Sequence, residues 1–211
     1  TKKIIRKMKK ILTLAALICI SITTNAQSNA KKLLDEVTAK VQSYNSFSLN
    51  FTYTISGKDS NGKLDVQKDK YVVEFMGVKQ LYDGSKTYLI NPMDEEVGIS
   101  SKGSQDALSL SKILTFYTTG YTYSMDIKMK EAGKNIQYVK LKPTNQKNDI
   151  KEILLGIDLA TKNIYKKIEV LKNGSKNTLT IKSFKTNPTF SKNHFTFTKS
   201  QYPNYYIHNI D

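Results

Sequence analysis

Apolar and polar residues alternate strictly in the segment 47–55. Every second position is large and apolar, and small or polar residues lie between them; the apolar positions are Phe47, Leu49, Phe51, Tyr53 and Ile55. A period of two places these side chains on one face of a β-strand. The pattern therefore predicts a strand with one apolar face, which covers either a hydrophobic core or a cavity.

Two helices are predicted from a different spacing of apolar residues. Over residues 28–45, apolar side chains recur at helical spacing opposite charged ones; they are Leu33, Leu34, Val37, Val41 and Tyr44. The segment 105–117 is strongly apolar and lacks strict alternation; its apolar residues include Leu108, Leu110, Ile113, Leu114, Phe116 and Tyr117. Both helices need an apolar surface to lie on.

Most of the remaining chain has the alternation and turn residues of short strands. The predicted strands are 46–57, 63–67, 70–76, 79–82, 86–90, 96–101, 121–130, 135–142, 150–159, 164–171, 177–186 and 193–198. A polar turn is expected over 57–62, and Asp83-Gly84 predicts a tight hairpin. Roughly eleven strands with local turns indicate a mainly β fold, an up-and-down antiparallel sheet that is strongly curved or closed.

The first 26 residues are predicted to be a secretory signal. Six cations precede an uncharged apolar run, 11–22, and small residues lead to Ala26. The mature protein is then expected to start near Gln27, so that 27–211 is exported and forms a single domain. Cys19 raises the alternative of a lipid anchor, but Ile18 stands where a small residue normally precedes such a cysteine. Without further cysteines, stability has to come from a core.

The charge of the chain favours a solvated surface. The net charge is +15, and removal of residues 1–26 leaves 27 lysines against 18 acidic residues, a charge of +9. Lysine-rich surfaces mainly keep proteins soluble, although they also attract anionic membranes. Nucleic acid is not an expected partner, because the only arginine of the chain is Arg6.

Candidate catalytic chemistry is sparse. The two histidines, His194 and His208, cannot make a zinc site alone, and no cysteine follows residue 26. The pairs Ser60…Lys63 and Ser109…Lys112 lack the companion motifs of serine hydrolases. We expect no enzyme activity, no metal site and no cofactor.

Apolar residues on the predicted strands exceed what a small core obviously needs. They include Leu64, Val66, Tyr71, Val73, Phe75, Tyr88, Ile90, Tyr121, Tyr123, Met125, Ile127 and Met129. Aromatic residues and methionines supply broad walls that adapt to different ligands. Composition alone is compatible with an ordinary core or with a ligand cavity.

The order of these features resembles the periplasmic lipoprotein carrier family (LolA-like). The resemblance covers nearly all of 27–211. It rests on the helix 32–37, the alternation from Phe47 to Phe51, the segment 81–92 around Asp83-Gly84, and the strands and turns 157–184, followed by Phe195-Thr196-Phe197 and Tyr202-Pro203. The family implies an unclosed antiparallel barrel of about eleven strands, with helices over a hydrophobic cavity on the concave face.

The resemblance also implies a function. Such proteins shield the acyl chains of lipoproteins between an inner-membrane transporter and an outer-membrane acceptor. On this hypothesis the cavity wall comprises Phe47, Leu49, Phe51, Tyr53, Phe75, Tyr88 and Ile90, and the lid contacts are Leu34, Val37, Val41, Leu110, Ile113 and Leu114. A monomer is expected. The arginine with which well-studied carriers latch the lid has no counterpart in 27–211, and no residue is assigned to that role.

Two other functions are compatible with the sequence. One is a non-transport role of the same fold in the cell envelope, as a stress sensor or an outer-membrane assembly partner. The other is a secreted hydrolase, which requires histidines or carboxylates that converge in a pocket.

Overall fold

The computed structural model describes residues 29–101, 114–145 and 147–211. The predicted signal peptide and most of the predicted second helix, 105–117, lie outside these ranges. A helix covers 29–42. The strands are β1 (Ser46–Ile55), β2 (Lys58–Gln67), β3 (Lys70–Phe75), β4 (Val78–Tyr82), β5 (Thr87–Asn91), β6 (Glu96–Ser100), β7 (Tyr121–Glu131), β8 (Lys134–Pro143), β9 (Ile150–Asp158), β10 (Ile164–Leu171), β11 (Lys176–Thr186) and β12 (Tyr206–Asn209). Two short 3₁₀ helices, η1 (Phe116–Thr118) and η2 (Lys199–Gln201), complete the described elements.

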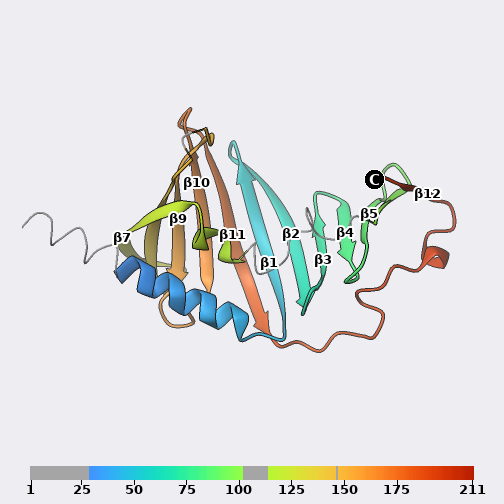
Figure 1. Ribbon diagram of the computed structural model, residues 1–211, viewed down its shortest axis with the longest axis horizontal. Coiled ribbons are helices and arrows are strands. Elements are labelled where there is room, and N and C mark those ends of the chain that lie inside the picture. Colours follow the sequence, from blue (N-terminus) through green and yellow to red (C-terminus); the bar gives the residue numbers. More distant parts are fainter. Residues whose placement is uncertain (1–28, 102–113, 146) are drawn as a thin grey trace, which may run out of the picture.

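All twelve strands belong to one curved sheet (Figure 1). Their order is β12-β6-β5-β4-β3-β2-β1-β11-β10-β9-β8-β7. Neighbours are antiparallel except β12, which pairs with β6 in parallel. The two end strands, β7 and β12, are not hydrogen-bonded to each other within the described ranges, so the sheet stays open. The predicted class, a mainly β fold with an unclosed antiparallel barrel, is confirmed.

Four hairpins turn within two residues, and in three of them both turn residues have positive φ. Ser56-Gly57, Met76-Gly77 and Ala132-Gly133 all have positive φ angles, between 47° and 79°. Two consecutive positive φ values define the mirror-image turn that matches the twist of a hairpin, and glycine adopts the second value at no steric cost. The predicted polar turn over 57–62 is therefore wrong, because β2 begins at Lys58 and continues through Gly62.

The helix covers one face of the sheet, here called the inner face (Figure 1). Its buried residues share one hydrophobic cluster with inner residues of the strands; the helix contributes Ala30, Leu33, Leu34, Val37 and Val41. Val37 is fully buried, as are Val139, Leu141, Leu155 and Ile157 on β8 and β9. The predicted amphipathic helix thus lies on the apolar face for which its spacing is suited.

The opposite, outer face has its own apolar cover. After β11 the chain runs back behind β2–β5, and Phe195 forms a second buried cluster with Val72 and Leu81. Tyr88 and Phe197 stack with ring centroids 4.5 Å apart. The strand predicted over 193–198 is wrong: these residues form turns and irregular chain, and their aromatic side chains reach the sheet without joining it. The sequence analysis also missed β12, a strand of four residues.

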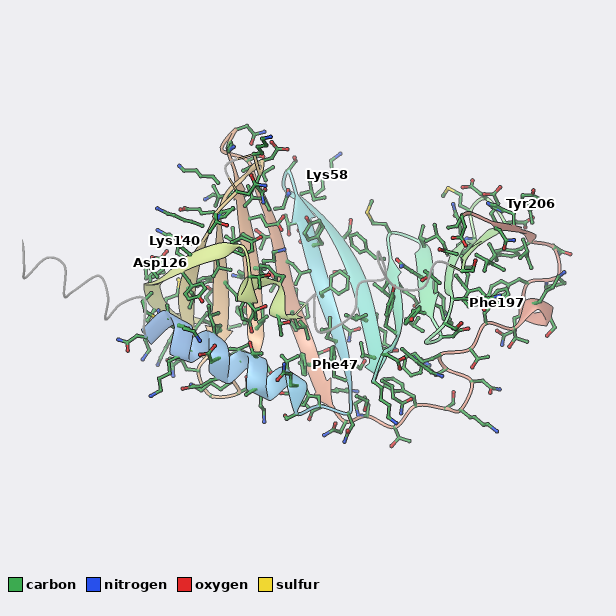
Figure 2. All side chains as sticks on the ribbon, viewed as in Figure 1. Phe47, Lys58, Asp126, Lys140, Phe197 and Tyr206 are labelled. Atoms are coloured by element: carbon green, nitrogen blue, oxygen red, sulfur yellow. The ribbon has the colours of Figure 1, made fainter. Side chains whose placement is uncertain are left out.

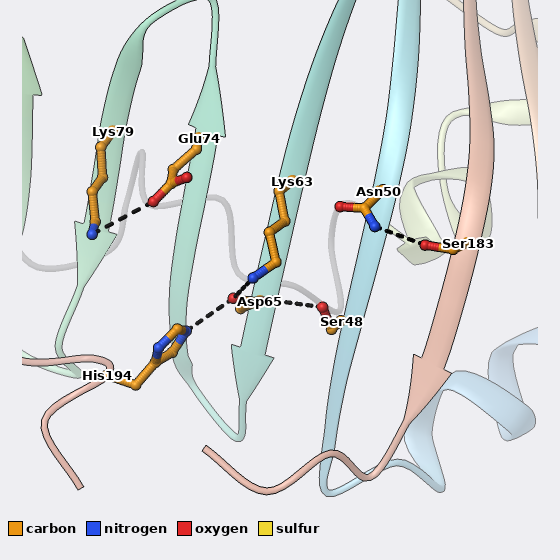
Figure 3. Close-up of polar contacts among 8 residues, drawn as sticks. All are labelled: Ser48, Asn50, Lys63, Asp65, Glu74, Lys79, Ser183 and His194. Carbon is orange, nitrogen blue, oxygen red and sulfur yellow. Dashed lines mark hydrogen bonds and ion pairs between the residues drawn. The ribbon is translucent and has the colours of Figure 1, made fainter. Parts of the chain in front are cut away.

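A buried carboxylate fastens this C-terminal segment to the sheet (Figure 3). Asp65 on β2 accepts hydrogen bonds from Ser48 Oγ at 2.5 Å and Lys63 Nζ at 2.8 Å, and His194 Nε2 lies 2.9 Å from its Oδ2. Its side chain is only 3% exposed. Burial opposes ionisation, but the hydrogen bonds from Lys63, Ser48 and His194 and the charge of Lys63 together lower the pKa of Asp65.

The Asp65 contacts predict a pH-dependent contribution to stability. The pKa in the folded state lies below the unfolded value of about 3.9, so the carboxylate stabilises the fold above that pH, and this contribution is lost as the pH falls through the folded pKa. Asp65→Asn should lower the free energy of unfolding at pH 7 by about 1–3 kcal/mol. Urea denaturation at pH 7 and pH 3 should show a smaller difference for the variant than for the wild type. The exposed Asp59→Asn is the control, and equal pH dependence of all three proteins would contradict the assignment.

Candidate functional site

The inner face of the sheet brings most of the predicted wall and lid together. Phe47, Leu49 and Phe51 on β1 are buried in the same cluster as Leu34 and Val37 of the helix. Val41 and Leu114 belong to it as well. Figure 2 shows Phe47 close to the end of the helix, and the Phe47 ring stacks on Phe184 of β11 at 5.3 Å. Leu110 and Ile113 lie outside the described residues.

Away from the helix, three aromatic side chains gather on the inner face of β1–β3. The ring centroid of Phe75 is 5.5 Å from that of Phe51 and 6.0 Å from that of Tyr53. The Phe51 ring lies directly over Gly62, where an added Cβ atom would stand 2.2 Å from its Cζ. The absence of a side chain at Gly62 is what allows Phe51 to lie flat against β2. We refer to Phe51, Tyr53 and Phe75 as the aromatic cluster.

A depression of about 650 Å³ opens beside the aromatic cluster. Pairing between β2 and β3 stops at Gly62 and Phe75, whereas β2 continues to Lys58 in contact with β1 alone. β3 ends at this level and turns into β4, so the last part of β2 has no neighbour on that side, and the depression, here called the notch, occupies the place. Its lining joins residues of β1–β4 and β11 with the turns that follow β3 and β5: Asn50, Phe51, Asn61, Gly62, Lys63, Glu74, Phe75, Met76, Gly77, Val78, Lys79, Pro92 and Lys182.

Residues 114–118 lie between β6 and β7, just before β7, and they pack over the inner face. Tyr117 is 1% exposed, its hydroxyl oxygen lies 3.0 Å from Thr38 Oγ1 on the helix, and burial raises its pKa. The neighbouring Phe116 ring has Lys167 Nζ 4.6 Å from its centroid, and the same amine pairs with Glu169 at 2.5 Å. These contacts connect the helix, residues 116–117 and β10 around the main hydrophobic cluster.

Two residues of the predicted wall lie on the other face, so this part of the prediction is wrong. Directly opposed residues of neighbouring strands share a face. Tyr88 pairs with Leu81, and Leu81 pairs with Val72, which belongs to the outer cluster. Ile90 has the same parity as Tyr88 and is therefore also on the outer face. The predicted alternation was right, but the choice of face at β5 was not.

Several inner-face residues were missed by the sequence analysis. Gly62 was interpreted only as a turn former, although its neighbours Leu64 and Val66 already continue the period of two. Tyr121, Leu179 and Phe184 pack on the main cluster and carried the same signal of alternation, but none of them was assigned to the predicted wall, although Tyr121 was placed on an apolar strand face. Lys167 was not foreseen, since one lysine among many has no distinguishing pattern.

The described residues hold no group of three or more histidine, cysteine or acidic side chains suited to a metal ion. Both histidines are away from the inner face: His194 contacts Asp65, and His208 lies on β12 with its ring stacked on Tyr206 at 5.0 Å. Within the described parts of the chain, none of the helices has both the length and the apolar character needed to cross a bilayer.

Comparison with known proteins identifies the family. Residues 42–198 match the family described as outer membrane lipoprotein carrier protein LolA. The chain belongs to the LolA family. The match includes β1 to β11, and with them every wall residue named above, but not the helix residues Leu34, Val37 and Val41. Among curated protein sequences none matches the chain.

Solved structures align with most of the chain. An uncharacterised conserved protein from Thermus thermophilus aligns with a TM-score of 0.62 and 10% identity over 86% of this chain and 99% of its own. A putative outer membrane lipoprotein-sorting protein domain from Vibrio parahaemolyticus gives 0.43 and 11% over 80% and 97%. The Pseudomonas aeruginosa MucA/MucB complex gives 0.48 and 15% over 81% and 62%. At such identities the likeness concerns the fold alone.

The contact between Phe51 and Gly62 gives a testable prediction. Gly62→Ala places a Cβ atom inside the Phe51 ring, so the ring must leave its position, and we expect a loss of about 1–3 kcal/mol in the free energy of unfolding. Near-ultraviolet circular dichroism should report the altered packing of the aromatic cluster.

Gly156→Ala is the matched control, because its added Cβ atom meets Tyr138 on the outer face at 2.9 Å. It should destabilise the protein without changing the environment of Phe51. An unchanged stability of Gly62→Ala would show that the Phe51 ring is not confined.

Proposed function

We propose that this protein is a periplasmic carrier that shields the acyl chains of lipoproteins, or of related lipids, on the inner face of its sheet. The observation that carries the proposal is the apolar cluster that the helix shares with the inner face of β1–β3, with the notch beside its aromatic end. The proposed wall comprises Phe47, Leu49, Phe51, Tyr53 and Phe75, and the proposed lid contacts comprise Leu34, Val37, Val41 and Leu114. Membership of the LolA family supports the assignment.

The physical basis is the cost of moving a hydrocarbon chain through water. Each buried methylene contributes about 0.8 kcal/mol, so a lipid tail needs an apolar wall along most of its length. The notch, at about 650 Å³, falls in the range of small-molecule sites, about 300–1,000 Å³. The aromatic cluster lies at its inner edge, and half-buried Tyr53 and Phe75 offer ring faces to a chain that enters there.

An acyl chain that continues from the notch onto the inner face meets side chains that are already packed. Leu34, Val37 and Val41 are packed on the strands in the described state, each 9% exposed or less. Loading therefore requires the helix to move away from β1 and β11, and the cargo has to replace the contacts that are lost. Release follows the same route in reverse when a membrane or an acceptor binds the acyl chain more tightly.

This function implies an inner-membrane transporter as donor, an outer-membrane acceptor, and a monomeric carrier between them. A binding role of this kind requires no catalytic residue. The non-transport role in the envelope is the alternative with the same fold, and it does not require that acyl chains occupy the inner face.

Acyl-chain binding is the test of the proposal. Phe75→Glu should weaken binding of a fluorescent fatty acid by about tenfold or more, because it introduces a charge at the edge of the apolar wall. The matched control is Phe197→Glu, the same change at a half-buried phenylalanine of the outer face. It should bind as the wild type does.

Mass spectrometry of the wild type after incubation with acylated lipoprotein provides a second measurement. We expect a stoichiometric complex. If the wild type takes up neither fatty acid nor lipoprotein under conditions that load a known carrier, the carrier function is wrong.

A further inference from the structure

The notch carries positive charge beside its aromatic side chains. Its lining contains three lysines, Lys63, Lys79 and Lys182, but only one carboxylate, that of Glu74. The three lysines come from β2, β4 and β11, so they surround the notch from different strands. Figure 3 shows Lys63 and Lys79 on the outer side of the sheet, with Glu74 between them.

The existing partners of these lysines leave binding capacity. Lys63 Nζ lies 2.8 Å from Asp65, but 47% of its side chain is exposed and Asp65 has other donors in Ser48 and His194. Lys79 Nζ is 3.6 Å from Glu74, a distance too long for a strong hydrogen bond. Lys182 is exposed and has no hydrogen bond or ion pair with any described residue. An ammonium group offers three hydrogen-bond donors, so each lysine can donate a hydrogen bond to a further anion.

The apolar part of the notch lies next to these charges. Phe51 and Phe75 point to the inner face at the level where β3 ends, whereas Lys63 and Lys79 belong to the outer side. Lys182 lines the notch from the bulge of β11 opposite Asn50 and Phe51. A ligand at the notch therefore meets cations at one end and aromatic rings at the other. This is the arrangement of an acidic amphiphile, with an anionic headgroup attached to a hydrocarbon chain.

We propose that the notch binds the acidic headgroup of a single-chain amphiphile, a carboxylate or a phosphate monoester, through Lys63, Lys79 and Lys182, while the acyl chain passes over Phe51 and Phe75 onto the inner face. The inference rests on the proposed acyl-chain function and names the class of lipid that the same face prefers. It places the headgroup beside the part of β2 that extends past the turn between β3 and β4.

The test compares acidic lipids with neutral lipids of the same chain length. Binding of palmitate and of palmitoyl lysophosphatidate is measured by displacement of a neutral fluorescent acyl probe, beside hexadecanol and monopalmitoylglycerol, at low ionic strength where lysine contacts are least screened. For the wild type we expect at least one acid to bind about tenfold more tightly than its neutral partner. Whichever acid shows the preference identifies the headgroup as carboxylate or phosphate.

The double variant Lys79→Gln/Lys182→Gln should lose this preference and bind hexadecanol as the wild type does. Its melting temperature should be unchanged, because neither lysine is part of the buried Asp65 network. Lys128→Gln is the matched control: this exposed lysine of β7 does not line the notch, and its removal changes the net charge without changing the preference.

Each result decides between the two proposals. Equal binding of acids and neutral lipids by the wild type overturns the headgroup site and leaves the acyl-chain function intact. A preference that survives in the double variant places the anion elsewhere and overturns the assignment to the notch. Failure of every lipid to bind refutes the acyl-chain function, and the headgroup site with it.

Discussion

An open sheet with apolar residues on both faces has to cover each face separately. A closed barrel buries its interior with its own strands, but here the strand order ends at β7 and β12. The helix 29–42 covers the inner face, and the chain beyond β11 covers the outer face of β2–β5. Nearly every other feature follows from this constraint. Along each strand, alternate residues point to opposite faces, so one set packs against the helix and the other set packs against the C-terminal segment.

The two covers differ in how firmly they are held. The outer cover is fixed by directed polar contacts, in particular that of His194 with the buried Asp65, and by the parallel strand β12. The inner cover lies mainly on apolar contacts, with two polar links to the helix: the contact of Tyr117 with Thr38, and the partly exposed ion pair of Glu36 with Lys162 at 2.8 Å. Apolar contacts are non-directional and can be replaced by a hydrocarbon ligand at little cost. The helix side is thus the one that a lipid can displace.

The sequence determined the class of fold and most of the inner face. The alternation on β1 and the helical spacing of Leu34, Val37 and Val41 are local patterns. Such patterns predict the element correctly when one of its faces is buried. Assignment of Tyr88 and Ile90 failed for the opposite reason. Alternation shows that two residues share a face, but only the pairing of β5 with β4 decides which face it is.

The features that the sequence did not reveal depend on contacts between distant segments. Gly62 matters because of the Phe51 ring that lies above it, and the notch exists because β3 ends opposite that residue while β2 continues. Similarly, 193–198 looked like a strand because Phe195 and Phe197 alternate. These rings instead fill gaps on the outer face, and the backbone between them makes turns.

The pairing of β1 with β11 has a consequence for how the chain folds. Phe47 stands opposite Thr186, so the seam in the middle of the sheet joins segments that are far apart in sequence. Such contacts are slow to form, since the entropy of closing a long loop is lost before the contact stabilises anything. Until β11 pairs with β1, one edge of β1 is unpaired and its aromatic face is exposed to solvent. Such an edge can pair with other chains, so its protection until β11 is in place is a requirement set by topology.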